Sequence, residues 1–394
     1  MKKSEPKIVI ENLVKIYGSK PQKALQLFKS GGTRDSILKA TGNVLGIADV
    51  SFTINQGELF VIMGLSGSGK STLVRCINRL INPTTGSIYI DDEDIAKVDE
   101  NRMREIRLSK VSMVFQKFGL FPHRTVAENV EYGLKVKGVN QIERRQKALE
   151  NLESVGLGEW ANYLPSSLSG GMQQRVGLAR ALATDADILL MDEAFSALDP
   201  LIRREMQDEL LRLQKELHKT IVFISHDIQE ALKIGDRIAV MKDGAIVQIG
   251  TPEELITQPA DDYIRSFTED VNRAQVITVG SITREIQPFI LGEDSPSVAL
   301  EKISKEEYLC VVNSSHQPVG ILDQKTLTSA LAETSEITTV MKTDFPQVSA
   351  DSIIENTFPL YQQGLPIAVI DKKGKFQGIV TMADVLENIS NSEN

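Results

Sequence analysis

Two glycine-rich strings have the residue types and spacing of anion-binding loops. Residues 64–71 read Gly-Leu-Ser-Gly-Ser-Gly-Lys-Ser and match the pattern G-x-x-x-x-G-K-[ST]. In that pattern the backbone N–H groups cradle phosphates, the lysine bridges the β- and γ-phosphates, and the last hydroxyl holds Mg²⁺. An apolar strand at 60–63 and a helix at 71–80 give the loop its required context. The predicted nucleotide-binding residues are Gly64, Ser66, Gly67, Gly69, Lys70, Ser71 and Thr72, with Ser71 also a metal ligand.

Four polar side chains are expected at the sheet edge beside this loop. Asp192 and Glu193 follow one apolar run, His226 follows another, and Gln116 stands where a further strand should end. We predict that Asp192 orients Mg²⁺ through water and that Glu193 polarises the attacking water as a general base. His226 is predicted to align Glu193 or to contact the γ-phosphate, and Gln116 to touch both the metal and the water. Taken singly, each residue has a structural alternative, such as a strand-to-turn junction or a solvated loop amide.

The second glycine string predicts a second anion site. Ser169, Gly170 and Gly171 open a helix near Met172, and the N–H groups at a helix start attract anions. A long helical stretch at 126–165 separates this loop from the phosphate loop, so one chain is not expected to place both on the same phosphates. A head-to-tail homodimer does so, with ATP between one chain's phosphate loop and the partner's Ser169 loop. Hydrolysis would then separate the pair.

Composition limits the class of protein. A chain of 394 residues is expected to form two or three domains, and 41% hydrophobic with 25% charged residues is typical of a soluble protein. No run approaches the roughly 18 apolar residues of a membrane span, and no signal peptide is evident at the start. Two cysteines in apolar surroundings favour a reducing, cytoplasmic compartment. The net charge of −9 argues against nucleic acid as the main ligand.

The order of apolar runs predicts an α/β core. Strands expected at 7–16 and 47–62 flank an insertion at 19–45 with two short helical patterns, and residues 141–180 are expected to be mostly helical. Alternating strands and helices predict a parallel sheet with flanking helices. Charge marks a boundary near residue 270, because residues 271–394 hold 9 Lys and Arg against 16 Asp and Glu, whereas the first 270 hold 35 against 37.

The C-terminal region repeats itself at an offset of 58 residues. Placing Gly320 on Gly378 aligns 311–313 with 369–371, and 320–322 with 378–380. Each copy is predicted to form a strand, a turn, a strand and a helix, and the two copies to pack as a pseudo-symmetric module. Chance similarity between short hairpins is the alternative.

Together these strings resemble the motifs of ABC ATPases. GLSGSGKS, LSGGMQQ, ILLMDE, SALD and SHD are similar to the Walker A, signature, Walker B, D-loop and H-loop motifs, over residues 7–250. The resemblance implies ATP hydrolysis by a P-loop NTPase domain at 1–270 with a helical subdomain at about 117–180. It also implies an aromatic stacked on adenine at Tyr17, although the long insertion after Tyr17 departs from the family pattern and leaves another residue open. Asp199, in the D-loop-like segment, is expected at the nucleotide and between the two sites.

More narrowly, the chain resembles the ATP-binding subunits of bacterial osmoregulated glycine betaine/proline importers. The residues that carry this resemblance are 42–46, 116–125 and 193–203. It implies a homodimer that binds integral-membrane permease subunits on the cytoplasmic face of the cell membrane. Residues 118–123 resemble the region that meets a permease's coupling helix. A substrate-binding protein or domain is expected to act through the permease, and no nucleic acid is expected.

The C-terminal repeat resembles a tandem CBS pair, with copies at 276–332 and 334–390. Thr381 and Asp384 match the CBS residues that hold a ribose or phosphate, whereas the first copy has Asp323 and Thr326 in those places and is expected to be degenerate. The resemblance implies a regulatory adenine nucleotide or cyclic di-AMP near Thr381 and Asp384. Ionic-strength sensing is less favoured, because no cationic face is evident beyond residues 372–375. A pair that merely dimerises is the alternative.

Three other functions remain open from the sequence. One is the ATPase subunit of an importer for another small solute, such as methionine or a polyamine, because the solute never touches this chain. A second is a soluble ABC ATPase of DNA repair or translation, which the acidic balance and the lack of a second ATPase domain disfavour. A third is an adenylate sensor, which intact Lys70, Glu193 and His226 disfavour.

Overall fold

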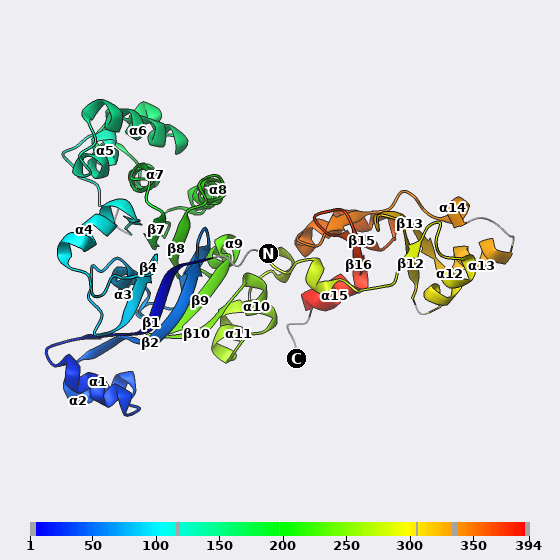
Figure 1. Cartoon of the computed structure of the whole chain (residues 1–394), viewed down its shortest axis with the longest axis horizontal. Helices are drawn as coiled ribbons and strands as arrows, with labels where there is room; N and C mark the ends of the chain where they lie inside the picture. The colour runs from blue at the N-terminus through cyan, green and yellow to red at the C-terminus, as the bar shows by residue number, and fades with distance from the viewer. Residues whose placement is uncertain (1–4, 116–118, 197, 305, 333–336, 391–394) are drawn as a thin grey trace. The chain divides into compact units, whose positions relative to one another are not determined.

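The computed structural model describes residues 5–115, 119–196, 198–304, 306–332 and 337–390. It divides the chain into two compact units, Met1–Thr268 and Glu269–Asn394, each with its own core. Figure 1 labels the elements of both units. None of the helices in the described ranges is long and apolar enough to cross a membrane.

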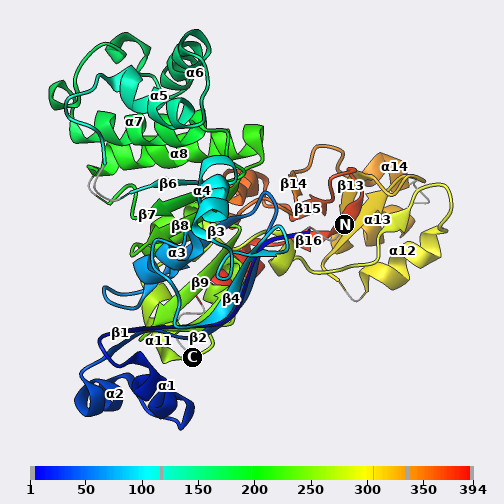
Figure 2. The same ribbon diagram turned by 60° about the vertical axis from the view of Figure 1, so that its left-hand side comes forward.

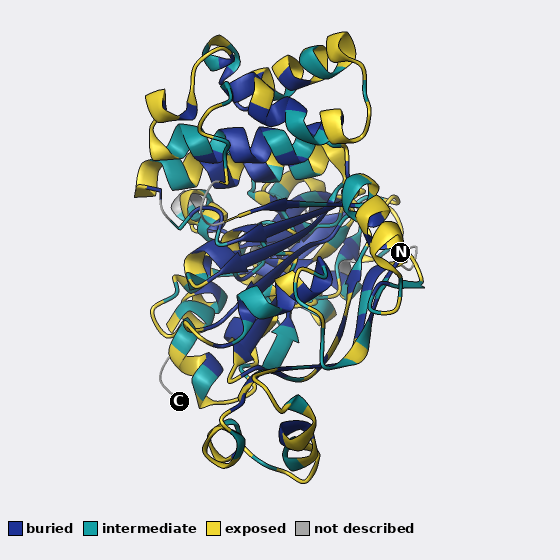
Figure 3. Cartoon of the chain, turned by 90° about the vertical axis from the view of Figure 1, so that its left-hand side faces the viewer, coloured by how far each residue is buried: buried dark blue, intermediate teal, exposed yellow. Residues whose placement is uncertain are grey.

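The centre of the first unit is a six-stranded sheet in the order β10-β9-β3-β8-β7-β6. All strands are parallel except β10, which pairs antiparallel with β9. Its strands are β3 (Leu59–Met63), β6 (Val111–Val114), β7 (Ile188–Asp192), β8 (Thr220–Ser225), β9 (Arg237–Lys242) and β10 (Ala245–Gly250). Continuous apolar runs form β3 and β7, and both strands are buried along their whole length, as parallel strands covered on both faces are (Figure 3). The expected α/β core is confirmed.

A second sheet, antiparallel, has the order β2-β1-β4-β5. Its strands are β1 (Pro6–Tyr17), β2 (Val44–Asn55), β4 (Thr85–Ile90) and β5 (Glu93–Asp94). The single strand expected at 47–62 is wrong, because a turn at Gly57, with φ of 75°, divides it into β2 and β3. The two pieces belong to different sheets, whose facing side chains share one apolar core with Phe52 stacked on Phe60 at 5.1 Å.

The insertion between β1 and β2 forms the two expected helices, α1 (Pro21–Lys29) and α2 (Arg34–Thr41). Thr33 caps the start of α2 by accepting the Ser36 N–H, and Gly42 ends it in the left-handed conformation. Apolar side chains of both helices pack on β1 and β2. The helices contribute Ala24, Leu25 and Ile37, and the strands contribute Val14, Ile16 and Leu45. Figures 1 and 2 show this helix pair at the end of the unit away from α5–α7.

The remaining helices of the unit cover the parallel sheet or extend beyond it. They are α3 (Lys70–Ile77), α4 (Glu100–Ser109), α5 (Val126–Val136), α6 (Gln141–Ser154), α7 (Gly170–Ala183), α8 (Pro200–Leu217), α9 (Ile228–Ile234), α10 (Pro252–Thr257) and α11 (Asp262–Thr268). The expected helix at 71–80 ends earlier, at Ile77, because Arg79 takes a φ of 47°. The expected helical run 141–180 is interrupted between α6 and α7 by two 3₁₀ turns.

The second unit contains two three-stranded sheets with the same internal order, β11-β12-β13 and β14-β15-β16. Their elements are β11 (Phe289–Ile290), α12 (Pro296–Ile303), β12 (Tyr308–Val312), β13 (Pro318–Asp323), α13 (Gln324–Ala332), α14 (Ile337–Val340), β14 (Gln347–Ser349), β15 (Ile367–Ile370), β16 (Phe376–Val380) and α15 (Met382–Ser390). Val311 lies opposite Gly320, and Val369 opposite Gly378. The two pairings differ by the expected 58 residues, so the repeat is confirmed in the strand register.

Each copy of the repeat is completed by the segment at the start of the other copy. Residues 274–282 contribute apolar side chains to the core of the second copy, whereas Ile337 packs in the core of the first. The backbone of Arg284 bridges to Ile379, and that of Lys342 bridges to Ile321. Arg284 and Lys342 are also 58 residues apart, so the exchange of segments obeys the same pseudo-symmetry.

Candidate functional site

The carboxyl ends of β3, β7 and β8 bring the predicted site residues to one edge of the sheet. Met63 pairs with Ser225, and Asp192 pairs with Ile224, so the three strands end level with one another. The phosphate loop follows β3, Glu193 follows β7, and His226 follows β8. Ligands of open α/β sheets bind at this edge. Gln116 lies outside the described residues.

The phosphate loop needs glycine where other backbone comes close. Gly64 and Gly69 have φ values of 146° and 107°, and a Cβ atom would stand 2.2 Å from the Met241 carbonyl oxygen and 2.5 Å from that of Gly46, respectively. Lys70, 4% exposed, donates from Nζ to the carbonyl oxygens of Gly64 at 2.8 Å and Leu65 at 3.0 Å. Burial lowers the pKa of Lys70, and the nearby carboxylates Glu193 and Asp192 oppose that shift. A cation is thus held inside the loop, where phosphate charge would favour it.

Two of the three residues predicted to hold Mg²⁺, Ser71 and Asp192, lie in contact. The Ser71 hydroxyl donates to Oδ1 of Asp192 at 2.9 Å, and Asp192 is 2% exposed. Nη2 of Arg75 lies 3.4 Å from Oδ2 of the same carboxylate. A hydroxyl and a carboxylate beside a phosphate cradle are the hard oxygen donors that Mg²⁺ prefers. These residues therefore fit the ion.

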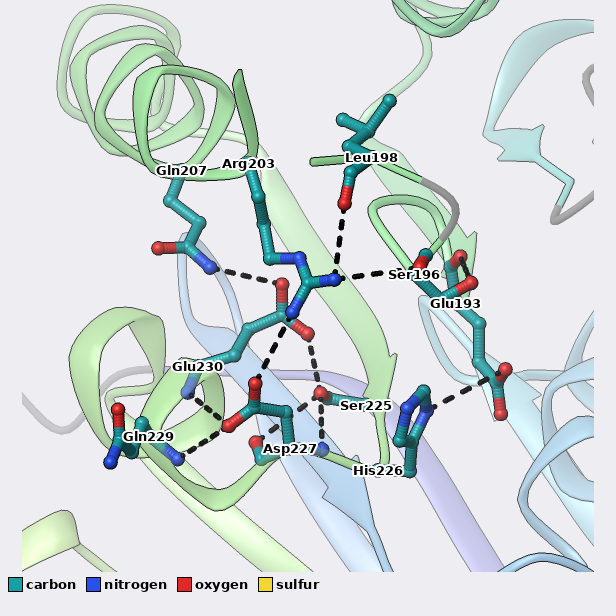
Figure 4. A network of polar contacts seen from close by, with 10 residues as sticks. All are labelled: Glu193, Ser196, Leu198, Arg203, Gln207, Ser225, His226, Asp227, Gln229 and Glu230. Carbon is teal, nitrogen blue, oxygen red and sulfur yellow. Dashed lines mark hydrogen bonds and ion pairs between the residues drawn. The ribbon is translucent and has the colours of Figure 1, made fainter. Parts of the chain in front are cut away.

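Glu193 and His226 face each other across the sheet edge. Nδ1 of His226 lies 3.7 Å from Oε2 of Glu193 (Figure 4). Glu193 has a φ of 49°, a conformation that costs free energy for a non-glycine residue and that turns its side chain out of the strand. The His226 side chain is 56% exposed and that of Glu193 is 20% exposed. The geometry suits a carboxylate general base beside an imidazole that can orient it or a bound water.

Behind this pair, residues 193–196 form a tight turn, and Leu198 and Asp199 stand directly before α8. The Ser196 hydroxyl donates to the Glu193 carbonyl oxygen at 3.0 Å. Asp199 caps α8 by accepting the Ile202 N–H at 3.1 Å, and its side chain stays exposed. Arg203 contacts both this turn and Asp227, which follows His226. Sequence reasoning missed Arg203, because one charged residue on an amphipathic helix gives no signal of its own.

Tyr17 lies beside the start of the phosphate-loop helix. Its hydroxyl is 3.1 Å from the Thr72 hydroxyl, and its ring lies across Gly46, where a Cβ atom would approach Cε2 to 2.8 Å. Arg34, from the insertion, donates to the Gly67 carbonyl oxygen at 3.1 Å and lies 3.5 Å from Asp243. The insertion thus reaches the phosphate loop itself. No sequence pattern pointed to Arg34, since the insertion matches no motif.

The Ser169 loop stands at the start of a 14-residue helix, α7. Ser169 caps it by accepting the Met172 N–H at 3.3 Å, and both Ser169 and Gly170 are exposed. Gly171 is half-buried against Ile202, whose Cγ2 a Cβ atom there would meet at 3.0 Å. Within the described ranges, no hydrogen bond or ion pair joins residues 169–171 to residues 64–72. The start of α7 is therefore exposed, and no bond that the structure describes ties it to the chain's own phosphate loop.

A buried asparagine organises the segment between the phosphate site and α5. Asn129, 0% exposed, accepts the Phe121 N–H and donates to the carbonyl oxygens of Phe121, Arg124 and Thr125. From α7, Arg180 donates to the Gly119 carbonyl oxygen at 2.6 Å. A cavity of about 640 Å³ lies beside this segment, between α5 and α6; its lining includes Arg124, Glu128, Glu131, Tyr132, Arg144 and Arg145. Sequence reasoning did not single out Asn129.

In the second unit, the residues predicted to hold a nucleotide form a closed polar cluster. Oδ2 of Asp384 accepts from both the N–H and the hydroxyl of Thr381 at 2.7 Å, and Oδ1 lies 3.2 Å from Nε of Arg284.

The first copy of the repeat makes the same cluster with the two residue types exchanged. Asp323 accepts the N–H and the hydroxyl of Thr326 at 2.8 Å, and Lys342 lies 3.5 Å from it. Asp and Thr can each cap a helix start, which explains how the pair survives the exchange. The aligned residues therefore differ, but both copies contain a carboxylate, a hydroxyl and a cation in contact.

Comparisons with known proteins agree with this geometry. The ABC transporter family model matches residues 47–196, and the CBS domain model matches residues 335–391. A solved dimer of the ATP-binding cassette MJ0796 in a post-hydrolysis state, bound to ADP and Pi, is similar with a TM-score of 0.54 and 36% identity, over 62% of this chain and 98% of that one. The fold and the phosphate site thus define an ATPase of the P-loop type.

Curated relatives extend the likeness over nearly the whole chain. The glycine betaine transport ATP-binding protein OpuAA of Bacillus subtilis is 49% identical over 95% of this chain and 90% of its own length. The glycine betaine/carnitine transport ATP-binding protein GbuA of Listeria monocytogenes is 46% identical over 98% of this chain and 98% of its own length. The glycine betaine/proline betaine transport system ATP-binding protein ProV of Salmonella typhimurium is 45% identical over 97% of this chain and 97% of its own length. The chain belongs to the ATP-binding subunits of ABC transporters.

Proposed function

We propose that this chain is the subunit whose ATP hydrolysis drives uptake of glycine betaine, or of a related quaternary amine or proline osmoprotectant. The observation that carries the proposal is the full-length likeness at 45% to 49% identity to three proteins named for glycine betaine transport. That likeness covers the second unit as well as the first. The phosphate loop and the Glu193–His226 pair supply the hydrolytic site.

The ATP site is proposed to be shared between two copies of the chain. One copy contributes the phosphate loop, Tyr17 and Asp192, and the partner contributes Ser169, Gly170 and Gly171, with Asp199 near the junction. The exposed start of α7 and the dimeric state of the solved cassette support this arrangement. Tyr17 would stack on adenine after its hydroxyl leaves Thr72. ATP then joins the two copies, because each phosphate loop is completed only by the other chain.

The side chains at the sheet edge have distinct roles in hydrolysis. Glu193 accepts a proton from the attacking water, and His226 holds the Glu193 carboxylate in position. Lys70 offsets the negative charge that gathers on the transferred phosphoryl group, in a position where water is excluded. Ser71, Asp192 and Gln116 are proposed to hold Mg²⁺, which supplies Lewis-acid stabilisation of the phosphate oxygens when bound.

Transmission to the membrane is proposed to run through the segment 119–125. This segment is held by Asn129 on one side and by Arg180 of α7 on the other. Movement of α7, which carries the Ser169 loop, would therefore reach the surface that meets a permease. The chain is accordingly placed at the cytoplasmic face of the cell membrane, bound through permease subunits, with a substrate-binding protein or domain acting on their outer side.

The second unit is proposed to bind a regulatory adenine nucleotide or cyclic di-AMP. Thr381, Asp384 and Arg284 offer a hydroxyl, a carboxylate for a ribose, and a cation for a phosphate. The matching cluster of Asp323, Thr326 and Lys342 supports a pair of equivalent sites rather than one.

Uptake into vesicles tests the proposed function. Vesicles that contain this subunit and the permease of the same transport system are loaded with ATP and given radiolabelled glycine betaine, with proline, methionine and spermidine as competitors. Glycine betaine should accumulate, and unlabelled glycine betaine should compete while methionine and spermidine should not. Accumulation of methionine or spermidine in place of glycine betaine would contradict the proposed solute.

A further inference from the structure

One arginine joins the turn after β7 to the turn after β8. From the first turn of α8, Arg203 donates through Nη2 to the carbonyl oxygens of Leu198 at 3.2 Å and Ser196 at 3.5 Å. Its Nη1 donates to Oδ2 of Asp227 at 3.4 Å (Figure 4). A planar guanidinium can hold several acceptors in a fixed arrangement, which a lysine ammonium cannot. Arg203 thus fixes the separation of the two turns that carry Glu193 and His226.

The turn that carries His226 is locked from its other side. The Asp227 N–H donates to the Ser225 hydroxyl at 3.0 Å, and that hydroxyl in turn donates to buried Glu230. Gln207 of α8 donates to the second oxygen of Glu230 at 3.1 Å, and Oδ1 of Asp227 caps α9. The backbone before and after His226 therefore has few ways to move except together with α8. His226 itself stays exposed beside Glu193.

We propose that Arg203 is a positioning residue for ATP hydrolysis, which couples the turn 193–196 and Leu198 to the turn 225–227. This inference rests on the proposed roles of Glu193 and His226. The exposed carboxylate of Asp199 directly follows Leu198, whose carbonyl oxygen accepts from Arg203. A partner chain that presses on Asp199 would therefore shift His226 relative to Glu193 through Arg203. Hydrolysis would then respond to closure of the dimer.

The structural alternative is that Arg203 merely ties α8 to α9. The chain contains a matched control for that alternative, because Lys233 of α9 pairs with Asp208 of α8 at 2.7 Å. This second ion pair joins the same two helices but contacts neither turn. A variant that breaks it measures the cost of losing a helix–helix tie alone.

The test compares Arg203→Ala, Arg203→Lys and Lys233→Ala in the full chain. We expect Arg203→Ala to lower kcat by roughly tenfold or more, since misplacement of reacting groups is costly, while the Kd for ATP stays within about twofold. The Hill coefficient for ATP should fall towards one, Arg203→Lys should recover part of kcat, and Lys233→Ala should match the wild type in all three. The thermal midpoint without nucleotide shows whether each variant folds.

Two results would overturn the proposal. One is equal loss of kcat in Arg203→Ala and Lys233→Ala, and the other is a folded Arg203→Ala variant with normal kcat and cooperativity. A double variant adds a check: Asp227→Asn should cost little further activity in the Arg203→Ala background, because the two residues act through one contact. None of these measurements involves the transported solute, so their outcome does not depend on which solute the transporter carries.

Discussion

At the scale of single residues, the site places one buried cation against two carboxylates. Lys70, whose pKa is lowered by burial, lies near Asp192 and Glu193, and carbonyl oxygens occupy its N–H groups. Phosphates would provide the compensating charge that the protein itself supplies only in part. The two carboxylates differ in their surroundings. Asp192 is buried and accepts a hydrogen bond from the Ser71 hydroxyl, whereas Glu193 faces the exposed imidazole of His226.

Replacing Glu193 by glutamine should stop turnover while ATP still binds. An amide keeps the size of the side chain but cannot accept a proton, so we expect kcat to fall at least about 100-fold. ATP should still drive two copies together, and sedimentation with and without ATP measures this directly. Glu216→Gln, an exposed carboxylate paired with Arg212, is the control and should keep full activity. Turnover near the wild-type rate in Glu193→Gln would refute its role as the base.

Residue types and spacing could predict the phosphate loop and the carboxylates, because phosphate and metal binding require particular residue types at fixed spacing in the sequence. They could not predict Arg34, Asn129 or Arg203, which act by reaching backbone carbonyl oxygens far away in the sequence. The exchanged pair Asp323 and Thr326 shows a second limit. Alignment of the two copies shows different residues at these two positions, which suggests that the first copy has no site. In the structure, however, Asp323 and Thr326 form the same carboxylate–hydroxyl hydrogen bond with the two residue types exchanged.

At the scale of elements, strand ends and helix starts bring the groups together. The sequence predicted the parallel core, the two short helices of the insertion and the 58-residue repeat, since apolar periodicity reports burial directly. It missed the break between β2 and β3, because the alternating pattern of β2 continues almost to the apolar run of β3 and only the turn at Gly57 separates them. Contacts between distant elements, such as that of α2 with the phosphate loop, depend on the tertiary fold.

The insertion should contribute to ATP affinity through Arg34. Removing its hydrogen bond to the Gly67 carbonyl oxygen should loosen the phosphate loop, and Arg34→Ala is expected to weaken ATP binding by about 1 kcal/mol, or about fivefold. Titration with a fluorescent ATP analogue gives the two Kd values. Lys39→Ala, an exposed basic residue on the same helix, removes equal charge and should leave the Kd unchanged. Equal weakening by both variants would assign the effect to charge alone.

Burial of Glu230 should make the first unit lose stability as pH rises. Burial raises the pKa of Glu230, while hydrogen bonds from Ser225 and Gln207 oppose the shift, Asp227 adds to it and Arg203 opposes it. Between the unfolded pKa and this raised value, the folded chain holds a proton that the unfolded chain has released. The free energy of unfolding therefore falls as pH rises through that window.

Glu230→Gln removes this titration, so its stability relative to the wild type should improve as pH rises above about 4.5. Urea unfolding followed by the fluorescence of Trp160, the single tryptophan and a residue of the same unit, measures both proteins across that range. Parallel pH profiles for the two proteins would contradict the expected contribution of Glu230.

At the scale of the whole molecule, two units with separate cores share one chain. The first contains the hydrolytic site, and the second holds two pseudo-symmetric clusters in which an acid, a hydroxyl and a cation meet. Each copy of the repeat packs a segment from the start of the other copy into its core, so a ligand bound at one cluster would affect the packing of both copies. This arrangement supports the proposal that the second unit binds a regulatory ligand.

Arg284→Ala should weaken the response to cyclic di-AMP. Loss of the cation beside Asp384 removes a phosphate partner, so the concentration for half-inhibition of ATP-driven uptake should rise about tenfold. Lys372→Ala removes an exposed cation of the same unit, paired with Asp351, and should respond as the wild type does. Unchanged inhibition in Arg284→Ala would place the regulatory ligand elsewhere.

Phosphate release and glycine betaine uptake should be measured together in the same vesicles, with the wild-type subunit and with Glu193→Gln. We expect glycine betaine to accelerate phosphate release by the wild type, uptake to rise in proportion, and both to be absent in the variant. Uptake that persists in Glu193→Gln, or phosphate release that another solute accelerates and glycine betaine does not, would refute the proposed function.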